Sequence, residues 1–205
     1  MIDWNAYRAA YDSMTFDQVA DYHDQVWDLF PDQRHYSREH MDAFFAPLGP
    51  VRVVEVGGWR GEAAAQILNR YPVTGWDNYE ICRAAVESPV TEDHRYRAIH
   101  PSDWPWLIPI SGYDVAVLAH VIEHIRATQL RFLIEWLADS GVKHIYVEAP
   151  LAEIGRSWRG QSSAHVLEVG WPEVVDLFAE SGYEPTSRSR NDEEMADVLT
   201  FSRGA

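Results

Sequence analysis

The stretch VRVVEVGGWRGE, residues 51–62, decides the fold of this chain. A β-branched run ends in Glu55, and three glycines follow at Gly57, Gly58 and Gly61 before helix-forming residues resume. This order predicts a buried parallel strand, a tight turn and the start of a helix. Glycine suits such a turn because a side chain would block the approach of a ligand to the backbone N–H groups, or would forbid the backbone angles.

The composition is that of a single globular domain. The chain has 205 residues, of which 46% are hydrophobic and 24% charged. Its formal net charge of -15 repels nucleic-acid phosphates, so we expect a small-molecule partner and no nucleic-acid partner. The single cysteine, Cys82, excludes an intramolecular disulfide. No signal peptide and no run of transmembrane length is found, so we expect a cytoplasmic protein with no membrane contact.

Residues 1–48 are expected to form a helical cap. Apolar and aromatic side chains recur there at helical spacing, and Pro31 interrupts the pattern. Two interpretations are open: the aromatic residues pack the helices onto the main domain, or they form a lid over a site. The helical spacing favours packing.

From residue 49 to residue 205 the sequence alternates between short apolar strands and helices. This alternation predicts one α/β unit, a Rossmann-like three-layer sandwich whose seven-stranded sheet is mostly parallel and ends in an antiparallel hairpin. Ligands of such sheets bind beyond the carboxyl ends of the strands. The expected strands are Val51–Val56, Pro72–Asp77, Tyr96–Ile99, Tyr113–Ala119, Val142–Glu148, Tyr183–Arg188 and Asp197–Ser202, and the expected helices after the first strand are Gly61–Asn69, Glu80–Glu87, Ile122–Asp139 and Trp171–Ser181.

Residues 51–205 resemble the class I S-adenosylmethionine-dependent methyltransferases. The turn Glu55-x-Gly57-Gly58-x-x-Gly61 resembles their first motif, and residues 113–125, YDVAVLAHVIEHI, resemble their fourth-strand motif. The resemblance implies S-adenosylmethionine as cofactor. Asp77 would hold the ribose hydroxyls and Asp103 the adenine. The residues implied to bind the cofactor are Glu55, Gly57, Gly58, Trp59, Gly61, Asp77, Asn78, Asp103, Trp104 and His120.

The turn departs from the family pattern at one position. The family's middle glycine is Trp59 here, and a glycine stands one place earlier at Gly58. Trp59 would project near the cofactor or over the mouth of the pocket. A dinucleotide-binding dehydrogenase shares the glycine-rich turn and the acidic second strand. A dehydrogenase would leave two features unaccounted for, the segment at residues 113–125 and the final hairpin.

A histidine–carboxylate cluster is the second candidate site. His120, Glu123 and His124 stand at helical spacing after the fourth strand, and His165 follows the fifth. In one interpretation Glu123, His124 and His165 are catalytic, with a neutral imidazole accepting a proton from the acceptor. In the other, His120 joins these three in binding a divalent metal. That set resembles the metal site of small-RNA 2′-O-methyltransferases, with His120 in place of a glutamate.

The sequence therefore predicts a methyltransferase that acts on an oxygen or nitrogen atom of a small molecule. Metal-assisted RNA 2′-O-methylation is the first alternative. A catalytically inactive cofactor-binding regulator of the same fold is the second. Two arginines and a tryptophan in the loop after the fifth strand can clamp an anionic acceptor or can simply be solvated: Arg156, Trp158 and Arg159. The remaining histidines are expected at the surface or in the core: His23, His35, His40, His94, His100 and His144.

Overall fold

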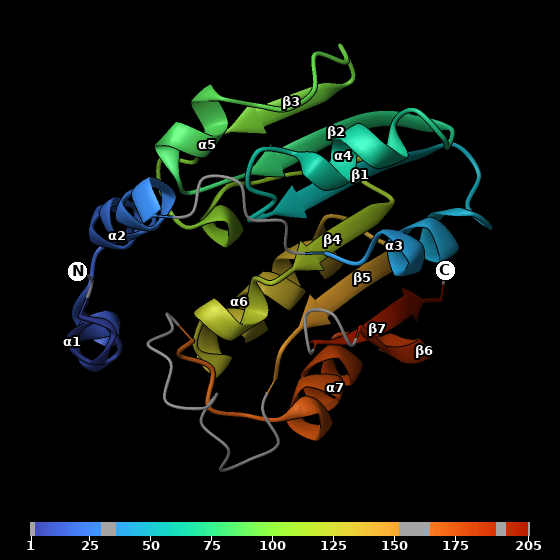
Figure 1. The fold of residues 1–205 in the computed structure, drawn as a ribbon. Coiled ribbons are helices and arrows are strands. Elements are labelled where there is room, and N and C mark those ends of the chain that lie inside the picture. The colour runs from blue at the N-terminus through green and yellow to red at the C-terminus, as the bar shows by residue number, and fades with distance from the viewer. Residues whose placement is uncertain (1–2, 30–35, 152–164, 192–195, 205) are drawn as a thin grey trace.

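The computed structural model describes residues 3–29, 36–151, 165–191 and 196–204. Seven strands in this part of the chain form one sheet in the order β3-β2-β1-β4-β5-β7-β6, as Figure 1 shows. The first five strands pair in parallel, and β7 pairs antiparallel with both β5 and β6, which confirms the predicted sheet with its antiparallel hairpin. The strands are β1 (Val51–Val56), β2 (Val73–Tyr79), β3 (Tyr96–Ile99), β4 (Val115–Ala119), β5 (His144–Ala149), β6 (Tyr183–Asn191) and β7 (Ala196–Arg203).

Helices cover both faces of the sheet and complete the three layers. Helices α6 and α7 pack on one face, and α3 and α4 pack on the other. The helices are α1 (Trp4–Ala10), α2 (Phe16–Leu29), α3 (Arg38–Phe45), α4 (Glu62–Ile67), α5 (Arg83–Glu87), α6 (Ala127–Asp139) and α7 (Trp171–Glu180), with short 3₁₀ turns η1 (Tyr11–Ser13), η2 (Pro105–Leu107) and η3 (Ile122–His124).

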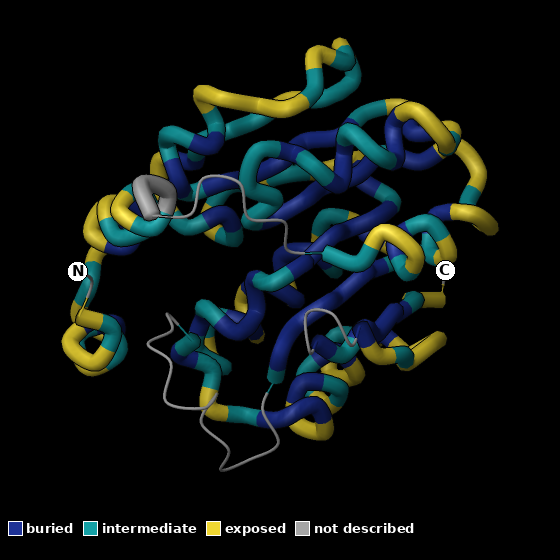
Figure 2. The backbone as a smooth tube through the Cα atoms, in the orientation of Figure 1, coloured by how far each residue is buried: buried dark blue, intermediate teal, exposed yellow. Residues whose placement is uncertain are grey.

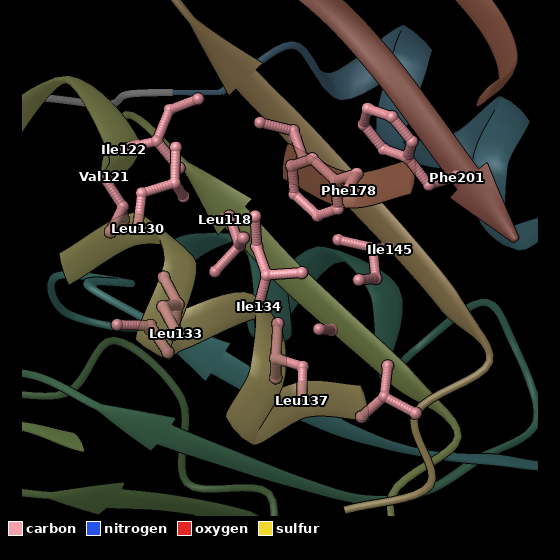
Figure 3. Packing of buried hydrophobic residues seen from close by; sticks show 14 of the residues in the cluster. Leu118, Val121, Ile122, Leu130, Leu133, Ile134, Leu137, Ile145, Phe178 and Phe201 are labelled. Atoms are coloured by element: carbon pink, nitrogen blue, oxygen red, sulfur yellow. The ribbon is translucent and has the colours of Figure 1, made fainter. Parts of the chain in front are cut away.

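The α6 face holds the larger part of the core. Leu130, Leu133, Ile134 and Leu137 lie on one side of α6, at the spacing that a helix needs to present a single apolar stripe. They pack with alternate side chains of β4 and β5, and Figure 3 shows Phe178 of α7 and Phe201 of β7 in the same cluster. In Figure 2 the buried segments run through the sheet and along the inner sides of these helices.

The N-terminal region divides between two positions. Met41 and Phe45 of α3 are buried against the α4 face of the sheet, so α3 belongs to an outer layer of the sandwich. Helices α1 and α2 instead form a third cluster, in which Tyr7, Tyr11 and their neighbours pack on Val166 and Trp104. The aromatic residues of α1 and α2 thus pack the cap onto the main domain. The division of the chain into domains at residue 48 stays a prediction.

Several expected boundaries were wrong, and the end of β2 changes the site. β2 continues two residues past Asp77 to Tyr79, because the ladder with β1 extends until Tyr79 accepts from the N–H of Gly57. The expected helix at Glu80 begins only at Arg83. The long helix expected from Ile122 begins at Ala127, after η3 and an extended residue.

No helix in the described ranges is long and apolar enough to cross a membrane.

Neighbouring positions of α6 provide a matched test of the core. Leu133 is fully buried, whereas 55% of Phe132 is exposed. We expect Leu133→Ala to lower the free energy of unfolding by about 2–5 kcal/mol, because it removes packed atoms and leaves a cavity. Phe132→Ala should change it by less than about 1 kcal/mol. Urea unfolding of both variants checks this, and equal effects would show that α6 does not pack as described.

Candidate active site

The carboxyl ends of β1, β2, β4 and β5 form one edge of the sheet. In Figure 1 the arrows of these strands point toward the side of the molecule where α1 and α2 lie. The strand order reverses between β1 and β4, since β2 and β3 extend the sheet on one side and β4 and β5 on the other. Open α/β sheets bind ligands at this kind of switch point. The turn after β1 and the histidine cluster after β4 both lie there.

The turn from Gly57 to Gly61 needs glycine at its two ends. Gly57 has φ +69° and Gly61 has φ +82°, which are left-handed values that other residues rarely adopt. A Cβ at Gly57 would lie 2.7 Å from a methyl group of Val121, and one at Gly61 would lie 2.5 Å from the ring of Tyr96. The predicted need for glycine, to avoid a clash and to allow the backbone angles, is thus confirmed at Gly57 and Gly61.

Trp59 also takes the left-handed conformation, with φ +50°. A left-handed residue other than glycine is strained unless its surroundings hold it. Here the Trp59 N–H donates to Oε2 of Glu80 at 2.8 Å, and its carbonyl accepts from the side-chain amide of Asn78 at 3.1 Å. The glycine at Gly58 meets a different need, because a Cβ there would overlap the carboxyl group of Glu55 at 2.1 Å.

Asn78 and Glu80 hold the turn from the neighbouring strand. The side-chain oxygen of Asn78 accepts from the Gly58 N–H at 3.0 Å. Glu80 is 2% exposed, and its second oxygen accepts from the Cys82 N–H at 2.7 Å. Burial raises the pKa of Glu80 to about 7, although these backbone hydrogen bonds act against the rise. Glu80 is thus the acidic side chain at the carboxyl end of β2.

Asp77 does not lie at the strand end, where the sequence had placed it. It lies within β2 and is 4% exposed. Arg52 donates to its Oδ2 at 2.8 Å, Arg97 donates to both of its oxygens at 2.9 and 2.7 Å, and the Tyr113 hydroxyl donates to Oδ2. Burial raises the pKa of Asp77, but these donors outweigh burial and lower it. Asp77 is committed to a structural network. Sequence reasoning missed Glu80 because it ended the strand too early.

Glu55 lies beneath the turn and is 1% exposed. Its Oε2 accepts from the indole N–H of Trp76 at 2.7 Å. Burial raises the pKa of Glu55 to about 8, and the Trp76 hydrogen bond only partly opposes this. The carboxyl group is therefore largely protonated near neutral pH unless a positively charged group binds beside it.

Trp104 is fixed between the loop after β3 and the cap. Its ring stacks on Trp106 with centroids 5.1 Å apart, and it contacts Phe16 of α2 edge to face at 5.5 Å. Asp103 is exposed, and its carboxylate accepts from the Trp104 N–H at 2.8 Å. The adenine role implied for Asp103 and Trp104 stays a prediction. Both residues lie in the loop that follows β3, as expected.

Glu123 is the centre of the histidine–carboxylate cluster. It is 1% exposed, and neither of its oxygens makes a hydrogen bond of ordinary geometry with any residue that the structure describes. The Nδ1 of His120 lies 3.3 Å from its Oε1. His120 directly follows β4 and has φ +53°, so it does not start a helix. Burial raises the pKa of Glu123, but the His120 contact and the charges of the neighbouring histidines lower it to about 2.

His124 and His165 lie beside this carboxylate. The Nε2 of His124 is 3.9 Å from Oε1 of Glu123, and the centroids of the two imidazole rings are 5.1 Å apart. His165 reaches the cluster because the N–H groups of Val166 and Leu167 donate to the Glu123 carbonyl at 2.8 and 3.2 Å. Burial lowers the pKa of His165, which favours a neutral ring. The structure thus brings together residues that stand about forty positions apart in the sequence.

Glu123, His124 and His165 have the composition of a metal site. One ligand atom from each lies within 4.8 Å of the others. Two imidazoles and a carboxylate suit zinc and other first-row divalent ions. A buried carboxylate that lacks hydrogen bonds of ordinary geometry also favours a positively charged neighbour, either a protonated histidine or a bound cation, since an unpaired buried charge is costly. These residues fit a divalent ion. His120 does not join this set of three and lies beside Glu123 instead.

Glu148, at the end of β5, connects the same edge to α3 and to the hairpin. Its Oε2 accepts from the Ser37 N–H at 2.8 Å and from the Tyr146 hydroxyl at 2.6 Å, and its Oε1 accepts from the Asn191 amide at 2.7 Å. The N–H of His120 donates to the Glu148 carbonyl at 2.7 Å. Glu148 therefore supports the base of the cluster.

His23 lies beside the cluster, a position that the sequence did not predict. It had been assigned to the surface or the core, yet its ring lies 5.9 Å from the ring of His124, centroid to centroid. Burial lowers the pKa of His23 to about 4. Nothing in the helical spacing of α2 indicated this contact, because it depends on how the cap packs. The loop residues Arg156, Trp158 and Arg159, expected near the acceptor, lie outside the described residues.

The raised pKa of Glu55 predicts a pH dependence of stability. A carboxyl group whose pKa rises from 4.5 to about 8 on folding stabilises the protein fully below pH 4.5, and this contribution is lost as the pH rises through 8. The free energy of unfolding of the ligand-free protein should therefore fall between pH 5 and pH 8. Glu55→Gln should reduce that fall by on the order of 2 kcal/mol.

Urea unfolding at several pH values measures this dependence. The exposed Glu135 of α6 gives the control, and Glu135→Gln should reproduce the slope of the unchanged protein. Parallel curves for the Glu55 variant and the unchanged protein would contradict the raised pKa.

Comparisons with known proteins place the fold. No protein-family model and no curated protein matches the sequence. Among solved structures, a 1,6-didemethyltoxoflavin N1-methyltransferase from Burkholderia thailandensis, with 1,6-didemethyltoxoflavin and S-adenosylhomocysteine bound, is 18% identical. It has a TM-score of 0.66, with 100% of this chain and 92% of that chain covered.

Two further structures show how broad the likeness is. A magnesium protoporphyrin IX methyltransferase from Synechocystis PCC 6803, with S-adenosylhomocysteine bound, is 10% identical with a TM-score of 0.68, covering 91% of this chain and 98% of that chain. The [4+2]-cyclase SpnF is 12% identical with a TM-score of 0.71, covering 93% of this chain and 97% of that chain. The chain thus has the Rossmann-like fold of the class I methyltransferases, a fold that the cyclase shares.

Proposed function

We propose that this protein is an S-adenosylmethionine-dependent methyltransferase that acts on an oxygen or nitrogen atom of a small molecule. One observation carries the proposal. The glycine turn after β1 and the histidine–carboxylate cluster after β4 lie on adjacent strands at the switch point of the sheet. A donor site and a set of proton-accepting groups are therefore neighbours. The methyltransferase structures of the same fold that hold S-adenosylhomocysteine support the choice of cofactor.

In this proposal the cofactor lies along the turn. Glu80 takes the ribose role that the sequence had given to Asp77. The Glu80 oxygens accept from the N–H groups of Trp59 and Cys82, and a carboxylate has about four lone-pair sites, so acceptor capacity remains for ribose hydroxyls. Glu55 lies below the turn, where its carboxylate would face the positively charged amino-acid end. Because Glu80 is 2% exposed, we expect neighbouring side chains to move when the cofactor enters.

In methyl transfer the main task of the protein is to align the acceptor with the methyl group of the cofactor. The sulfonium group of the cofactor makes its methyl carbon electrophilic, so the main task of the side chains is to position the acceptor in line with it. His124 and His165 lie where an acceptor would approach from the β4 side, and a neutral imidazole there can take the proton of a hydroxyl or amine. Glu123 orients these rings and balances the charge that the proton brings.

Calorimetry with S-adenosylhomocysteine tests the donor site. We expect the unchanged protein to bind it and Glu80→Gln to bind at least about tenfold more weakly, because hydrogen bonds to a charged group contribute about 1.5–3 kcal/mol. Asp77→Asn should keep the affinity and lower the free energy of unfolding, since it weakens the network with Arg52, Arg97 and Tyr113.

The opposite pattern, with affinity lost in the Asp77 variant and kept in the Glu80 variant, would return the ribose role to Asp77. Failure of both S-adenosylmethionine and S-adenosylhomocysteine to bind at millimolar concentration would overturn the enzyme proposal. Tight binding without methyl transfer to any acceptor would instead favour the cofactor-binding regulator. The left-handed Trp59 in the turn is the feature that keeps this alternative open.

A second candidate function is metal-assisted methyl transfer, with the 2′-hydroxyl of RNA as one possible acceptor class. The observation that favours it is the buried carboxylate of Glu123, with a ligand atom of His124 and of His165 within 4.8 Å. Those three residues would hold the ion, which would polarise an acceptor hydroxyl and lower its pKa. The net charge of -15 favours a small acceptor over RNA.

Divalent ions added to metal-depleted protein test this candidate. We expect one Co²⁺ to bind per chain, and Glu123→Gln to weaken that binding at least about tenfold, because the neutral amide loses the charge that the ion needs. Glu135→Gln, on the exposed side of α6, serves as control and should bind Co²⁺ like the unchanged protein. Equal affinity of the Glu123 variant would exclude the ion from this cluster.

A further inference from the structure

The side chain of Arg126 binds the N-terminal cap to the start of α6. Arg126 directly precedes α6, and its side chain is partly buried. Its Nε donates to a carboxylate oxygen of Asp12 in η1 at 2.9 Å, and its Nη2 donates to the carbonyl of Arg8 in α1 at 3.3 Å. The guanidinium carbon also lies 5.8 Å from the centre of the Tyr11 ring. Two of the three guanidinium nitrogens are therefore used to hold α1 and η1.

The remaining guanidinium nitrogen, Nη1, holds the segment that carries His165. It donates to the carbonyl of Val166 at 2.8 Å and to a carboxylate oxygen of Glu168 at 2.9 Å. The N–H of Val166 donates to the carbonyl of Glu123 at 2.8 Å. Both backbone polar groups of Val166 are thus paired, one with Glu123 and the other with the guanidinium. The backbone next to His165 cannot move away from the cluster without breaking one of these hydrogen bonds.

Val166 is also a residue on which the cap packs. It is 2% exposed, and it belongs to the apolar cluster that contains Tyr7, Tyr11 and Val19 of the cap. The same residue therefore receives the apolar side chains of the cap and the hydrogen bond from Arg126. As a result, docking of the cap and placement of His165 depend on one short stretch of backbone.

The guanidinium of Arg126 supports the cluster without being one of its candidate ligands. A metal ion would be held by Glu123, His124 and His165, whereas the guanidinium bonds to backbone carbonyls and to two other carboxylates. Its positive charge would repel a cation bound nearby. A charge effect of Arg126 on metal binding and a positioning effect therefore have opposite signs, which makes the two separable by experiment.

We propose that Arg126 is a positioning residue of the cluster, which holds His165 beside Glu123 and thereby couples docking of the cap to the binding of a divalent ion. This inference rests on the metal-assisted form of the proposed function. Such a coupling is reciprocal, because a docked cap that favours the ion requires that the bound ion favours the docked cap. An ion in the cluster would thus stabilise α1 and η1 although neither provides a ligand.

Co²⁺ titration of the full-length protein, followed by visible absorption, tests the positioning role. We expect Arg126→Gln to weaken Co²⁺ binding about 10-fold or more, since loss of groups that support metal ligands lowers affinity about 10–100-fold. Arg126→Lys keeps the charge but has a single nitrogen, so its affinity should lie between the two. Arg131→Gln removes an exposed ion pair with Glu180 from α6 and, as the control, should bind Co²⁺ like the unchanged protein.

The competing explanations predict different results. If Arg126 acts by its charge alone, Arg126→Gln removes a repulsion and binds Co²⁺ more tightly. If it only stabilises the fold, Arg126→Gln lowers the free energy of unfolding and leaves the Co²⁺ affinity of the folded protein unchanged. Either result overturns our inference, and the metal candidate survives if Glu123→Gln loses Co²⁺. Absence of Co²⁺ binding by the unchanged protein overturns both, whereas S-adenosylhomocysteine binding, measured in parallel, tests the methyltransferase proposal separately.

Amide hydrogen exchange tests the coupling from the cap side. We expect saturating Co²⁺ to slow the exchange of residues 7–10 of α1 in the unchanged protein, and to have little effect on them in Arg126→Gln. The amides of β3, at an edge of the sheet, are the internal control and should exchange alike with and without Co²⁺. Unchanged exchange of α1 in the Co²⁺-bound protein would overturn the coupling between the cap and the cluster.

Discussion

The hydrogen bonds from the glycine turn to Asn78 of β2 and to Glu80, which follows β2, are the interaction on which the rest of the structure depends. Asn78 and Glu80 accept from two consecutive N–H groups of the turn and hold Trp59 in a left-handed conformation. If β2 were shifted by one residue, its side chains would exchange faces and neither group could reach the turn. The register of one strand pair therefore fixes the turn, the start of α4 and the place where a ligand can approach.

The same edge of the sheet buries four glutamates, and each is stabilised differently. Glu80 accepts from backbone N–H groups, Glu55 accepts from an indole, and Glu148 accepts from a backbone N–H, a tyrosine and an asparagine. Among the described residues, the charged partners of the Glu123 carboxylate are histidines. The first three are satisfied by the fold itself. The fourth is the one whose surroundings call for a ligand, and for that reason the cluster around Glu123 carries the proposals about chemistry.

The sequence predicted the fold well because the fold depends on patterns local to the chain. Apolar runs, glycines and strand–helix alternation are enough to specify a doubly wound sheet. The exact end of β2 was not readable, since Tyr79 joins the ladder only through pairing with β1 and β3. The sequence therefore placed Asp77 at the strand end, where Glu80 stands in the structure, and it is Glu80 that we propose for the ribose role. His23 was missed for a related reason. Its contact with His124 depends on the docking of the cap, which no periodicity in α2 encodes.

The position of β7 between β5 and β6 has a consequence for how the chain folds. β6 precedes β7 in the sequence, yet within the described sheet it is joined to the other strands only through β7. β6 can therefore join the sheet only together with β7 or after it. Asn191, at the far end of β6, bonds to Glu148 below the histidine cluster. A change in the outermost strand can therefore reach the cluster through Glu148, although β6 lies two strands away from β5.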